Sequence, residues 1–412
     1  MELNMIVFGS PLSSRDSIFD DHKEILDLIK GENKVNYIFP EDLGRKQLKG
    51  ATMVFVGSGG VEEMVKMAID KLPSYVILIA DGLKNSLPAS LEILSWMRLE
   101  GRQGRVIHGD YDYMMQEINI YIAGYQVLDK LPRMRVGVIG KPSGWLIASN
   151  VDYSFIHNAW GTELIDLPLE EVVSIYEQVS PEDVEDDVDE FIQKASSIKE
   201  PTKEDICKAM RLCFALETVV QKYRLNAFTL NCFDLIPLTG TTGCVALSLL
   251  NDKGIPAGCE GDIQTLLTML VIKAATGKPS FMANPSKITN NARHEMIFAH
   301  CTIAPCMTDE YIIRTHYESQ SGVAIEGLVK PTTVTVVKCG GRHMERFFIS
   351  EAELLESTSN PNMCRTQLHL RLKEPLDYFL EHSIGNHHVI VNGDCRNCIE
   401  SILSMLGAAF IR

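Results

Sequence analysis

Residues 51–60, ATMVFVGSGG, join an apolar strand to a glycine-rich turn, and a helical pattern follows. The same order occurs near the N-terminus, where an apolar run at 5–8 precedes a helical pattern at 17–30. A further apolar run predicts a strand at 75–80. Strands and helices in alternation are typical of a parallel sheet covered by helices on both faces. The sequence therefore predicts an α/β domain at 1–132.

The pattern starts again after Leu131-Pro132, with a strand expected at 135–139 and a glycine-containing loop at 140–144. Towards the C-terminus, runs rich in β-branched residues alternate with turns, which favours antiparallel strands. The predicted fold is α/β, with two Rossmann-like parallel-sheet domains and a β-rich, barrel-like domain, at 1–132, 133–285 and 286–412. The elements expected in the last two domains are helices at 204–223 and 259–276, and strands at 228–232, 280–283, 296–301, 332–339 and 387–392.

Composition excludes several classes of partner. The 412 residues include 39 Lys and Arg against 54 Asp and Glu, so the formal charge is −15. Nucleic acids and anionic membranes attract basic surfaces, so neither is expected as a partner. The N-terminus lacks the basic segment of a secretory signal, and no apolar run is long enough to span a membrane. All eleven cysteines lie from Cys207 onward, and an odd number favours reduced thiols and a cytoplasmic location.

An acidic segment interrupts the second domain. Seven of the eleven residues at 181–191 are Asp or Glu, while Val184, Val188 and Phe191 recur at helical spacing. We interpret this segment as an amphipathic helix with a solvated acidic face, with Ser180 as its N-cap. The alternative interpretation is a cation-binding segment.

Two other motifs have simple structural interpretations. The glycine loops at 57–60 and 140–144 lack the spacing of dinucleotide- and phosphate-binding loops, so tight turns between strand and helix are favoured. Cys395 and Cys398 form a single CxxC, whereas a structural zinc site normally needs a second pair at similar spacing. Buried thiols are therefore favoured over a zinc site, which remains the alternative.

Four segments carry polar side chains at the ends of predicted strands and helices. They are AGCEGD at 257–262, SFMANP at 280–285, FAHC at 298–301 and GNHHV at 385–389. Taken alone, a carboxylate here can cap a helix, and a histidine can be a half-buried core residue. Neighbouring residues on a strand point to opposite faces, so at most one of His387 and His388 can face a given site.

Taken together and in this order, the four segments resemble the L-fucose isomerase and L-arabinose isomerase superfamily, and most of all its shorter L-fucose isomerase-like proteins. The resemblance implies a divalent cation, usually Mn²⁺, that carboxylates and imidazoles hold in a cleft between domains. It also implies an aldose–ketose isomerase that acts on a small sugar through a cis-enediol. A homotrimer or homohexamer, with the active site near a subunit interface, is the implied assembly.

Carried over residue by residue, the resemblance gives Glu260 as a metal-ligating carboxylate that also acts as acid or base. It gives His300 and His388 as imidazole ligands, with His387 as the second choice of its pair. Asn284 departs from the family pattern, which has Asp or Glu at this position. An amide oxygen can still ligate a cation, but it cannot take up a proton at neutral pH.

Asn284 leaves three possibilities open. Asp262 could supply the second acid/base group, because it lies two residues after Glu260. A water or a substrate hydroxyl could instead relay the proton from Glu260. The third possibility is a non-catalytic or altered sugar-binding protein of the same fold.

Four further residues are candidates for substrate binding. An indole can stack on a sugar ring, and Trp145 follows the loop at 140–144. Asn231 and Asp234 follow a predicted strand, where ligands of open α/β sheets gather. Thr241 lies in the next loop, TGTTG, and could bring its hydroxyl to a ligand.

Overall fold

The structure is a computed structural model, which describes residues 2–44, 48 and 50–411. Their contacts divide the chain into two compact units. The first unit ends at Asp129 and includes Ser404–Gly407, while the second holds Lys130–Leu403 and the segment from Ala408 onward. The predicted boundary after residue 285 therefore lies inside the second unit.

A five-stranded parallel sheet forms the core of the first unit, as the alternation of strands and helices predicted. The order β2-β1-β3-β4-β5 corresponds to Lys34–Ile38, Glu2–Phe8, Ala51–Val56, Tyr75–Ile79 and Gln103–Ile107. The accompanying helices are α1 (Arg15–Asp21), α2 (Lys23–Glu32), α3 (Glu62–Ala68), α4 (Ser86–Leu99) and α5 (Tyr111–Lys130). Strand β3 is buried along its whole length, which explains why its sequence is continuously apolar.

The single helix predicted at 17–30 is two helices, α1 and α2. They meet at His22, whose buried ring shares a 2.5 Å hydrogen bond with the carboxylate of Asp81. This contact accompanies a φ of −114° at His22, outside the helical range, and the chain turns there. Apolar spacing continues across the turn, so periodicity alone could not show it.

A four-stranded parallel sheet begins the second unit. The order β10-β9-β6-β7 corresponds to Ala257–Cys259, Ala227–Leu230, Arg135–Ile139 and Glu163–Leu167. Its helices are α6 (Tyr153–Trp160), α7 (Leu169–Tyr176), α9 (Lys203–Tyr223), α10 (Cys232–Thr239), α11 (Cys244–Asp252) and α12 (Ile263–Thr276). The helix predicted from residue 259 begins at Ile263, because Cys259 ends β10 and Asp262 caps α12.

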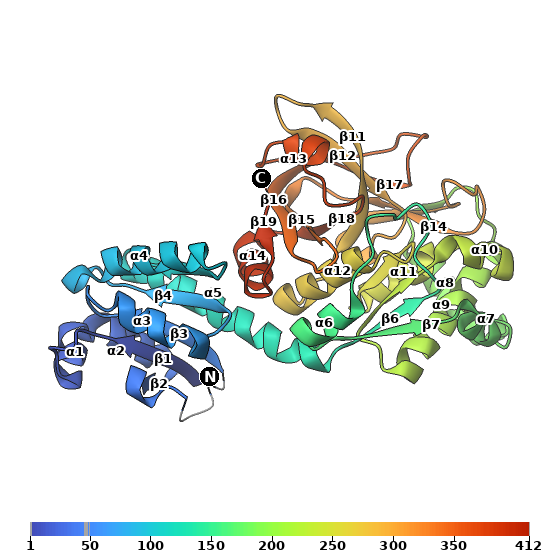
Figure 1. Ribbon diagram of the computed structural model, residues 1–412. Coiled ribbons are helices and arrows are strands. Elements are labelled where there is room, and N and C mark those ends of the chain that lie inside the picture. The colour runs from blue at the N-terminus through green and yellow to red at the C-terminus, as the bar shows by residue number, and fades with distance from the viewer. Residues whose placement is uncertain (1, 45–47, 49, 412) are drawn as a thin grey trace. The chain divides into compact units, whose positions relative to one another are not determined.

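A closed antiparallel barrel follows, and Figure 1 shows its strands in orange and red. The order β15-β18-β11-β12-β17-β16 corresponds to Thr332–Gly340, His388–Asn392, Phe281–Asn290, Glu295–His300, Thr366–Leu372 and Arg346–Thr358. Strand β16 pairs back with β15 and closes the barrel. The predicted β-rich, barrel-like fold is confirmed, although β11 is longer than the strand expected at 280–283.

Smaller elements complete the second unit. A three-stranded sheet, β14-β13-β8, consists of Ala324–Leu328, Glu310–Arg314 and Ser197–Ile198. Strand β19 (Ala409–Phe410) extends β16, and the remaining helices are α13 (Asp377–Glu381) and α14 (Arg396–Met405). The acidic segment forms η5 (Glu182–Val184) and α8 (Glu185–Lys194), which bury Val184, Val188 and Phe191 as an amphipathic segment should.

Helix α12 joins the parallel sheet to the barrel. It contacts β9 and β10 on the sheet side, and β15 and β18 on the barrel side (Figure 1). Its first ten residues are all buried, as expected for a helix that packs on both sides. The end of β10, the start of α12 and the start of β18 therefore lie together, and these segments carry the polar motifs.

No single helix of the described residues is long and apolar enough to cross a membrane. Helices α10 and α11 pass this test only as a pair, bent by 117°. Most of α11 is buried in the second unit.

Candidate functional site

Glu260, His300 and His387 converge from three distant segments of the second unit. Glu260 follows β10, His300 ends β12, and His387 directly precedes β18. Their potential ligand atoms all lie within 4.8 Å of one another. Glu260 Oε1 is 3.5 Å from His387 Nε2 and 3.9 Å from His300 Nε2. A carboxylate and two imidazoles in this arrangement form a suitable ligand set for a divalent cation such as Mn²⁺ or Zn²⁺.

The backbone around Glu260 is held in an uncommon conformation. Glu260 has a φ of +61°, in the left-handed region that few residues other than glycine adopt. Its carbonyl accepts a 2.9 Å hydrogen bond from the Ser143 amide. The next residue, Gly261, approaches Pro142 so closely that a Cβ there would lie 2.6 Å from the Pro142 Cα. The glycine loop at 140–144, expected to be only a tight turn, therefore seats Glu260.

Trp145 also orients the Glu260 carboxylate. Its indole Nε1 donates a 2.6 Å hydrogen bond to Glu260 Oε2, which leaves Oε1 facing the two histidines. The indole packs edge-on against Phe233, with 5.0 Å between ring centroids. Trp145 is therefore next to the site, as a substrate-binding residue would be.

The second nitrogen of each imidazole has its own partner. His300 Nδ1 lies 3.0 Å from Thr302 Oγ1, and His387 Nδ1 lies 3.0 Å from Asp262 Oδ2. A carboxylate can only accept, so His387 Nδ1 donates, and its Nε2 can offer a lone pair once that atom is unprotonated. That buried Nε2 faces Glu260 Oε1 at 3.5 Å. Outer partners of this kind are typical of histidines that bind metals, so the donor set fits a divalent cation.

The charges of the site depend strongly on one another. Burial raises the pKa of Glu260, but hydrogen bonds and charges from His300 and His387 outweigh this and hold the pKa well below its usual range. Burial lowers the pKa of His387, yet Asp262 and Glu260 together raise it to about 9. A cation bound here would take the place of the His387 proton, because a histidine ligand must be unprotonated.

The orientation expected for the histidine pair is corrected by the structure. His388, the first choice, points away from Glu260 into the barrel. Its Nδ1 donates to the Asn386 carbonyl at 2.9 Å, and its Nε2 accepts from the Tyr378 hydroxyl at 3.0 Å. Burial among aromatic rings lowers the pKa of His388 to about 3. His387 is the member of the pair that reaches the site.

Asp262 is not placed to exchange protons with a ligand. The carboxylate is fully buried and caps α12, where Oδ1 accepts from the Thr265 amide at 2.9 Å. Its Oδ2 accepts from Thr265 Oγ1 and His387, and lies 3.8 Å from the buried ammonium of Lys338. Asp262 therefore orients His387 and balances Lys338, which corrects its expected role as the second acid or base.

The residues that line the cavity beside Glu260 do not include any of the four substrate-binding candidates, although Trp145 contacts Glu260 directly. Asn231 is buried and caps α10 with its side chain, which also donates to Asp234 at 2.8 Å. Asp234 lines a different hollow, together with Tyr153 and Asp166. Thr241 is buried, and its neighbour Thr242 lines the cavity instead. Asn231 and Asp234 follow β9, whose end is occupied by the cap of α10, whereas Thr241 lies beyond the other end of that helix.

Glu260 and His300 line one cavity together with Asn284. The Asn284 Oδ1 accepts a 2.8 Å hydrogen bond from Asn386 Nδ2. The cavity is small, about 30 Å³, which suits an ion or a water and not a hexose. A sugar therefore requires exposed side chains beside the cavity to move, such as Trp145, which is 55% exposed.

Sequence reasoning missed most of the remaining cavity wall. His316, Glu318 and Phe233 contribute to it, as do five thiols: Cys232, Cys244, Cys259, Cys301 and Cys364. The sulfur atoms of Cys232 and Cys259 are 2.9 Å apart, and all eleven cysteines of the chain are free thiols. The five are scattered singly along the chain without ligand spacing. The sequence offered one sign of this thiol-lined wall, which is that all the cysteines lie in the second half of the chain.

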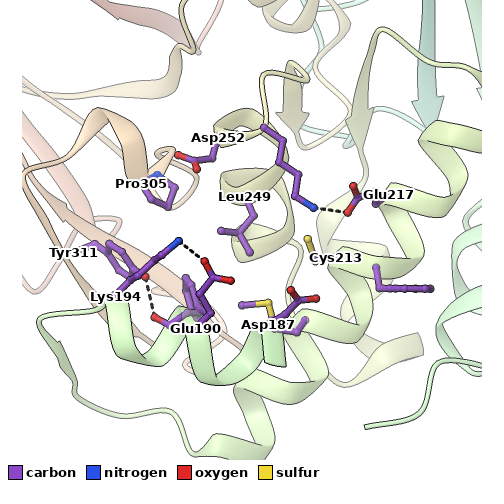
Figure 2. A pocket seen from close by; sticks show the side chains of 13 residues that line it. Asp187, Glu190, Lys194, Cys213, Glu217, Leu249, Asp252, Pro305 and Tyr311 are labelled. Atoms are coloured by element: carbon purple, nitrogen blue, oxygen red, sulfur yellow. Dashed lines mark hydrogen bonds and ion pairs between the residues drawn. The ribbon is translucent and has the colours of Figure 1, made fainter. Parts of the chain in front are cut away.

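A second cavity, of about 190 Å³, lies beside the acidic helix α8 and opens between α8, α9 and α11 (Figure 2). It shares no lining residue with the cavity at Glu260. Glu190 pairs with Lys194, and Glu217 pairs with Lys253, across its rim. Throughout the described residues, Glu260, His300 and His387 make up the group of three potential ligands that converges. Neither the acidic segment nor the CxxC at Cys395 belongs to such a group.

Comparison with known proteins agrees with this geometry. The family described as the L-arabinose isomerase central domain matches residues 152–277, which include Glu260 and α12. These matches support the resemblance to the L-fucose and L-arabinose isomerase superfamily.

Two relatives in this superfamily are named sulfoquinovose isomerase. The protein from Clostridium sp. (strain MSTE9) is 23% identical over 221 residues, or 53% of this chain and 48% of the relative. The protein from Priestia aryabhattai is 19% identical over 189 residues, or 46% of this chain and 41% of the relative. The matched part of the chain thus spans about half or less of the length of these superfamily members.

Proposed function

We propose that this chain is a metal-dependent aldose–ketose isomerase that acts through a cis-enediol. The observation that carries the proposal is the convergence of Glu260, His300 and His387, with Nε2 of His387 buried and 3.5 Å from Glu260 Oε1. The superfamily match and the relatives named sulfoquinovose isomerase support the same class of reaction.

Each residue of the site has a definite part in this proposal. Glu260, His300 and His387 would hold a divalent cation, for which we propose Mn²⁺. When bound, the cation supplies Lewis-acid stabilisation of the negative charge that develops on two neighbouring sugar oxygens. Asp262 and Thr302 orient the two imidazoles.

The neighbouring side chains would bind the sugar. Trp145 orients the Glu260 carboxylate and offers an indole face to the apolar side of a sugar ring. Asn284 offers an amide to a hydroxyl or to the cation, but it cannot carry the proton between the two carbons.

A second candidate function rests on Asn284. Its amide is held by Asn386, and neither side chain can take up a proton. A sugar-binding protein with the same fold and no turnover would have such a residue. It predicts that Mn²⁺ and sugar bind without conversion, and that Asn284→Asp creates or increases turnover.

A panel of aldoses tests the proposed function. Purified protein with added Mn²⁺ is assayed for ketose formation from L-fucose, L-arabinose, other pentoses and deoxy-sugars, and sulfoquinovose. We expect conversion of at least one sugar and one bound cation per chain, both lost in Glu260→Gln. No conversion of any sugar, together with no cation uptake by the unmodified protein, refutes the proposal.

The assembly and location are also proposals. A homotrimer or homohexamer is expected from the resemblance to the superfamily, with a cytoplasmic location. Light scattering during size-exclusion chromatography measures the mass in solution against the 46.0 kDa chain. A monomer at assay concentration would contradict the proposed assembly.

A further inference from the structure

The loop between β13 and β14 forms a built wall of the cavity at Glu260. Within it, the His316 amide donates to the Ser321 carbonyl, and His316 Nδ1 lies 3.0 Å from Ser319 Oγ. Gly322 packs so closely against Thr242 that a Cβ there would lie 2.7 Å from the Thr242 amide. These contacts hold the turn that carries Glu318 to the cavity.

Glu318 differs from the other polar groups that line the cavity, because it has no hydrogen bond or ion pair within the described part of the chain. The Glu260 carboxylate faces two histidines with Oε1 and accepts from Trp145 with Oε2. A carboxylate with both oxygens engaged is a poor acceptor for a further proton. Both nitrogens of His300 are engaged, because Nδ1 lies beside the Thr302 hydroxyl and Nε2 faces the Glu260 carboxylate.

Asn284 and three of the lining thiols are poor proton carriers. Asn284 does not ionise near neutral pH. The hydrogen bond to Cys232 and then burial raise the pKa of Cys259, and neighbouring thiols together with burial raise the pKa of Cys244 and Cys364 as well. Glu318 is solvent-exposed, so water can reach its carboxylate.

We propose that Glu318 is the proton-transferring carboxylate of this cavity. The proposal rests on the proposed function and names the residue that does the work expected of Asp262 or of a carboxylate at position 284. Both Glu318 and Glu260 act electrostatically on the Cys364 thiol, so the two carboxylates face one region from different walls. Glu260 binds the cation, and Glu318 moves the proton.

The proton transfer balances without an oxidant or reductant. Glu318 removes the proton from C2 of the aldose, and the C–H electron pair becomes the C1–C2 double bond while the C1–O1 π electrons move to O1, which takes a proton from a water molecule and leaves hydroxide. The product of this step is the cis-enediol. The hydroxide then takes the O2 proton as the C2 carbonyl forms, and Glu318 returns its proton to C1. The net change moves one proton from C2 to C1 and one from O2 to O1.

Three variants test the role of Glu318. Glu318→Gln keeps the shape and removes the base, whereas Glu318→Asp keeps the base on a shorter side chain. Glu310→Gln makes the same chemical change at an exposed position of the same hairpin and is the matched control. For each variant, kcat and KM, solvent deuterium incorporation into the sugar, the Mn²⁺ dissociation constant by calorimetry and the melting temperature are measured.

We expect Glu318→Gln to lower kcat and deuterium incorporation by about 10²–10⁴-fold, the usual contribution of a general base. Its Mn²⁺ dissociation constant and melting temperature should match those of the unmodified protein. Glu318→Asp should recover part of kcat, and Glu310→Gln should retain all of it.

Two outcomes overturn the assignment alone. One is a Glu318→Gln variant with unchanged kcat while Glu260→Gln is inactive, and the other is loss of Mn²⁺ binding in Glu318→Gln. Absence of turnover in the unmodified protein overturns the proposed function and this assignment together.

Discussion

Asp262→Asn separates the two roles of the buried Asp262 side chain, which caps α12 and carries the negative charge beside His387 and Lys338. Asparagine caps helices as well as aspartate does, so the start of α12 should keep its cap. The substitution removes the charge that faces His387 Nδ1 at 3.0 Å and the Lys338 ammonium at 3.8 Å. Asp262, His387 and Lys338 are fully buried, so water cannot solvate the charges that lose their partner.

Two magnitudes follow from these contacts. Loss of one partner from a buried ion pair costs about 3–5 kcal/mol, because the other charge remains uncompensated. We therefore expect the free energy of unfolding of the second unit to fall by about 3 kcal/mol or more. Loss of the partner that orients a ligating histidine weakens metal affinity by about 10–100-fold, which we expect for Mn²⁺.

The assay combines urea unfolding followed by circular dichroism with calorimetric Mn²⁺ titration. Lys338→Met in the Asp262→Asn background is the decisive control, because it removes the uncompensated ammonium. This double variant should recover most of the stability and none of the Mn²⁺ affinity. Unchanged Mn²⁺ affinity in the single variant would refute the orienting role of Asp262. Recovery of affinity in the double variant would attribute the effect to folding instead.

Three further perturbations test other parts of the structure. His387→Ala should weaken Mn²⁺ binding by at least 100-fold, whereas His388→Ala should retain binding and lose about 2–4 kcal/mol of stability, because it leaves a cavity and removes hydrogen bonds. Metal analysis and thermal unfolding compare the two variants. Equal loss of metal would contradict the assignment of His387, and not His388, to the site. Gly261→Ala should lower the free energy of unfolding by about 1–3 kcal/mol and reduce the amount of bound Mn²⁺, because φ at this position is +72° and a Cβ has no space there. A variant that binds Mn²⁺ normally would show that the turn is adaptable. Burial raises the pKa of Asp81, but hydrogen bonds from His22 and neighbouring groups outweigh this and hold the pKa below its ordinary value. The ionised Asp81 carboxylate should therefore stabilise the first unit fully above about pH 4, and this stabilisation should vanish as the pH falls below that. Asp81→Asn should therefore lower the melting temperature at pH 7 and have little effect at pH 2, and an equal effect at both values would contradict this.

Hydrophobic patterning was sufficient to predict the architecture. Continuous apolar runs such as 51–56 correspond to strands buried on both faces, and alternating runs such as 332–339 correspond to barrel strands. These patterns report directly on burial, which is why they predict class and order well. The break at His22 escaped prediction because it accompanies a contact with a distant carboxylate, Asp81, which periodicity does not report.

The candidate site shows the limit of pattern more clearly. Alternation required that only one of His387 and His388 face the site, and this holds. It could not choose between them, because Val389 and Ile390, the next residues on opposite faces, are both apolar and both buried. The choice depends on which face of β18 meets α12 and which meets the barrel interior. The contribution of Glu318 was equally hidden, since it depends on how one loop docks against Thr242.

The indole of Trp145 is an intrinsic fluorophore that directly contacts the candidate site. One of three tryptophans in the chain, it is the one whose ring nitrogen is tied to the candidate metal ligand, while Trp160 is 3% exposed and lies elsewhere. Occupancy at Glu260 changes the charge beside an exposed fluorophore, so emission should shift on titration with a cation or sugar without any attached label.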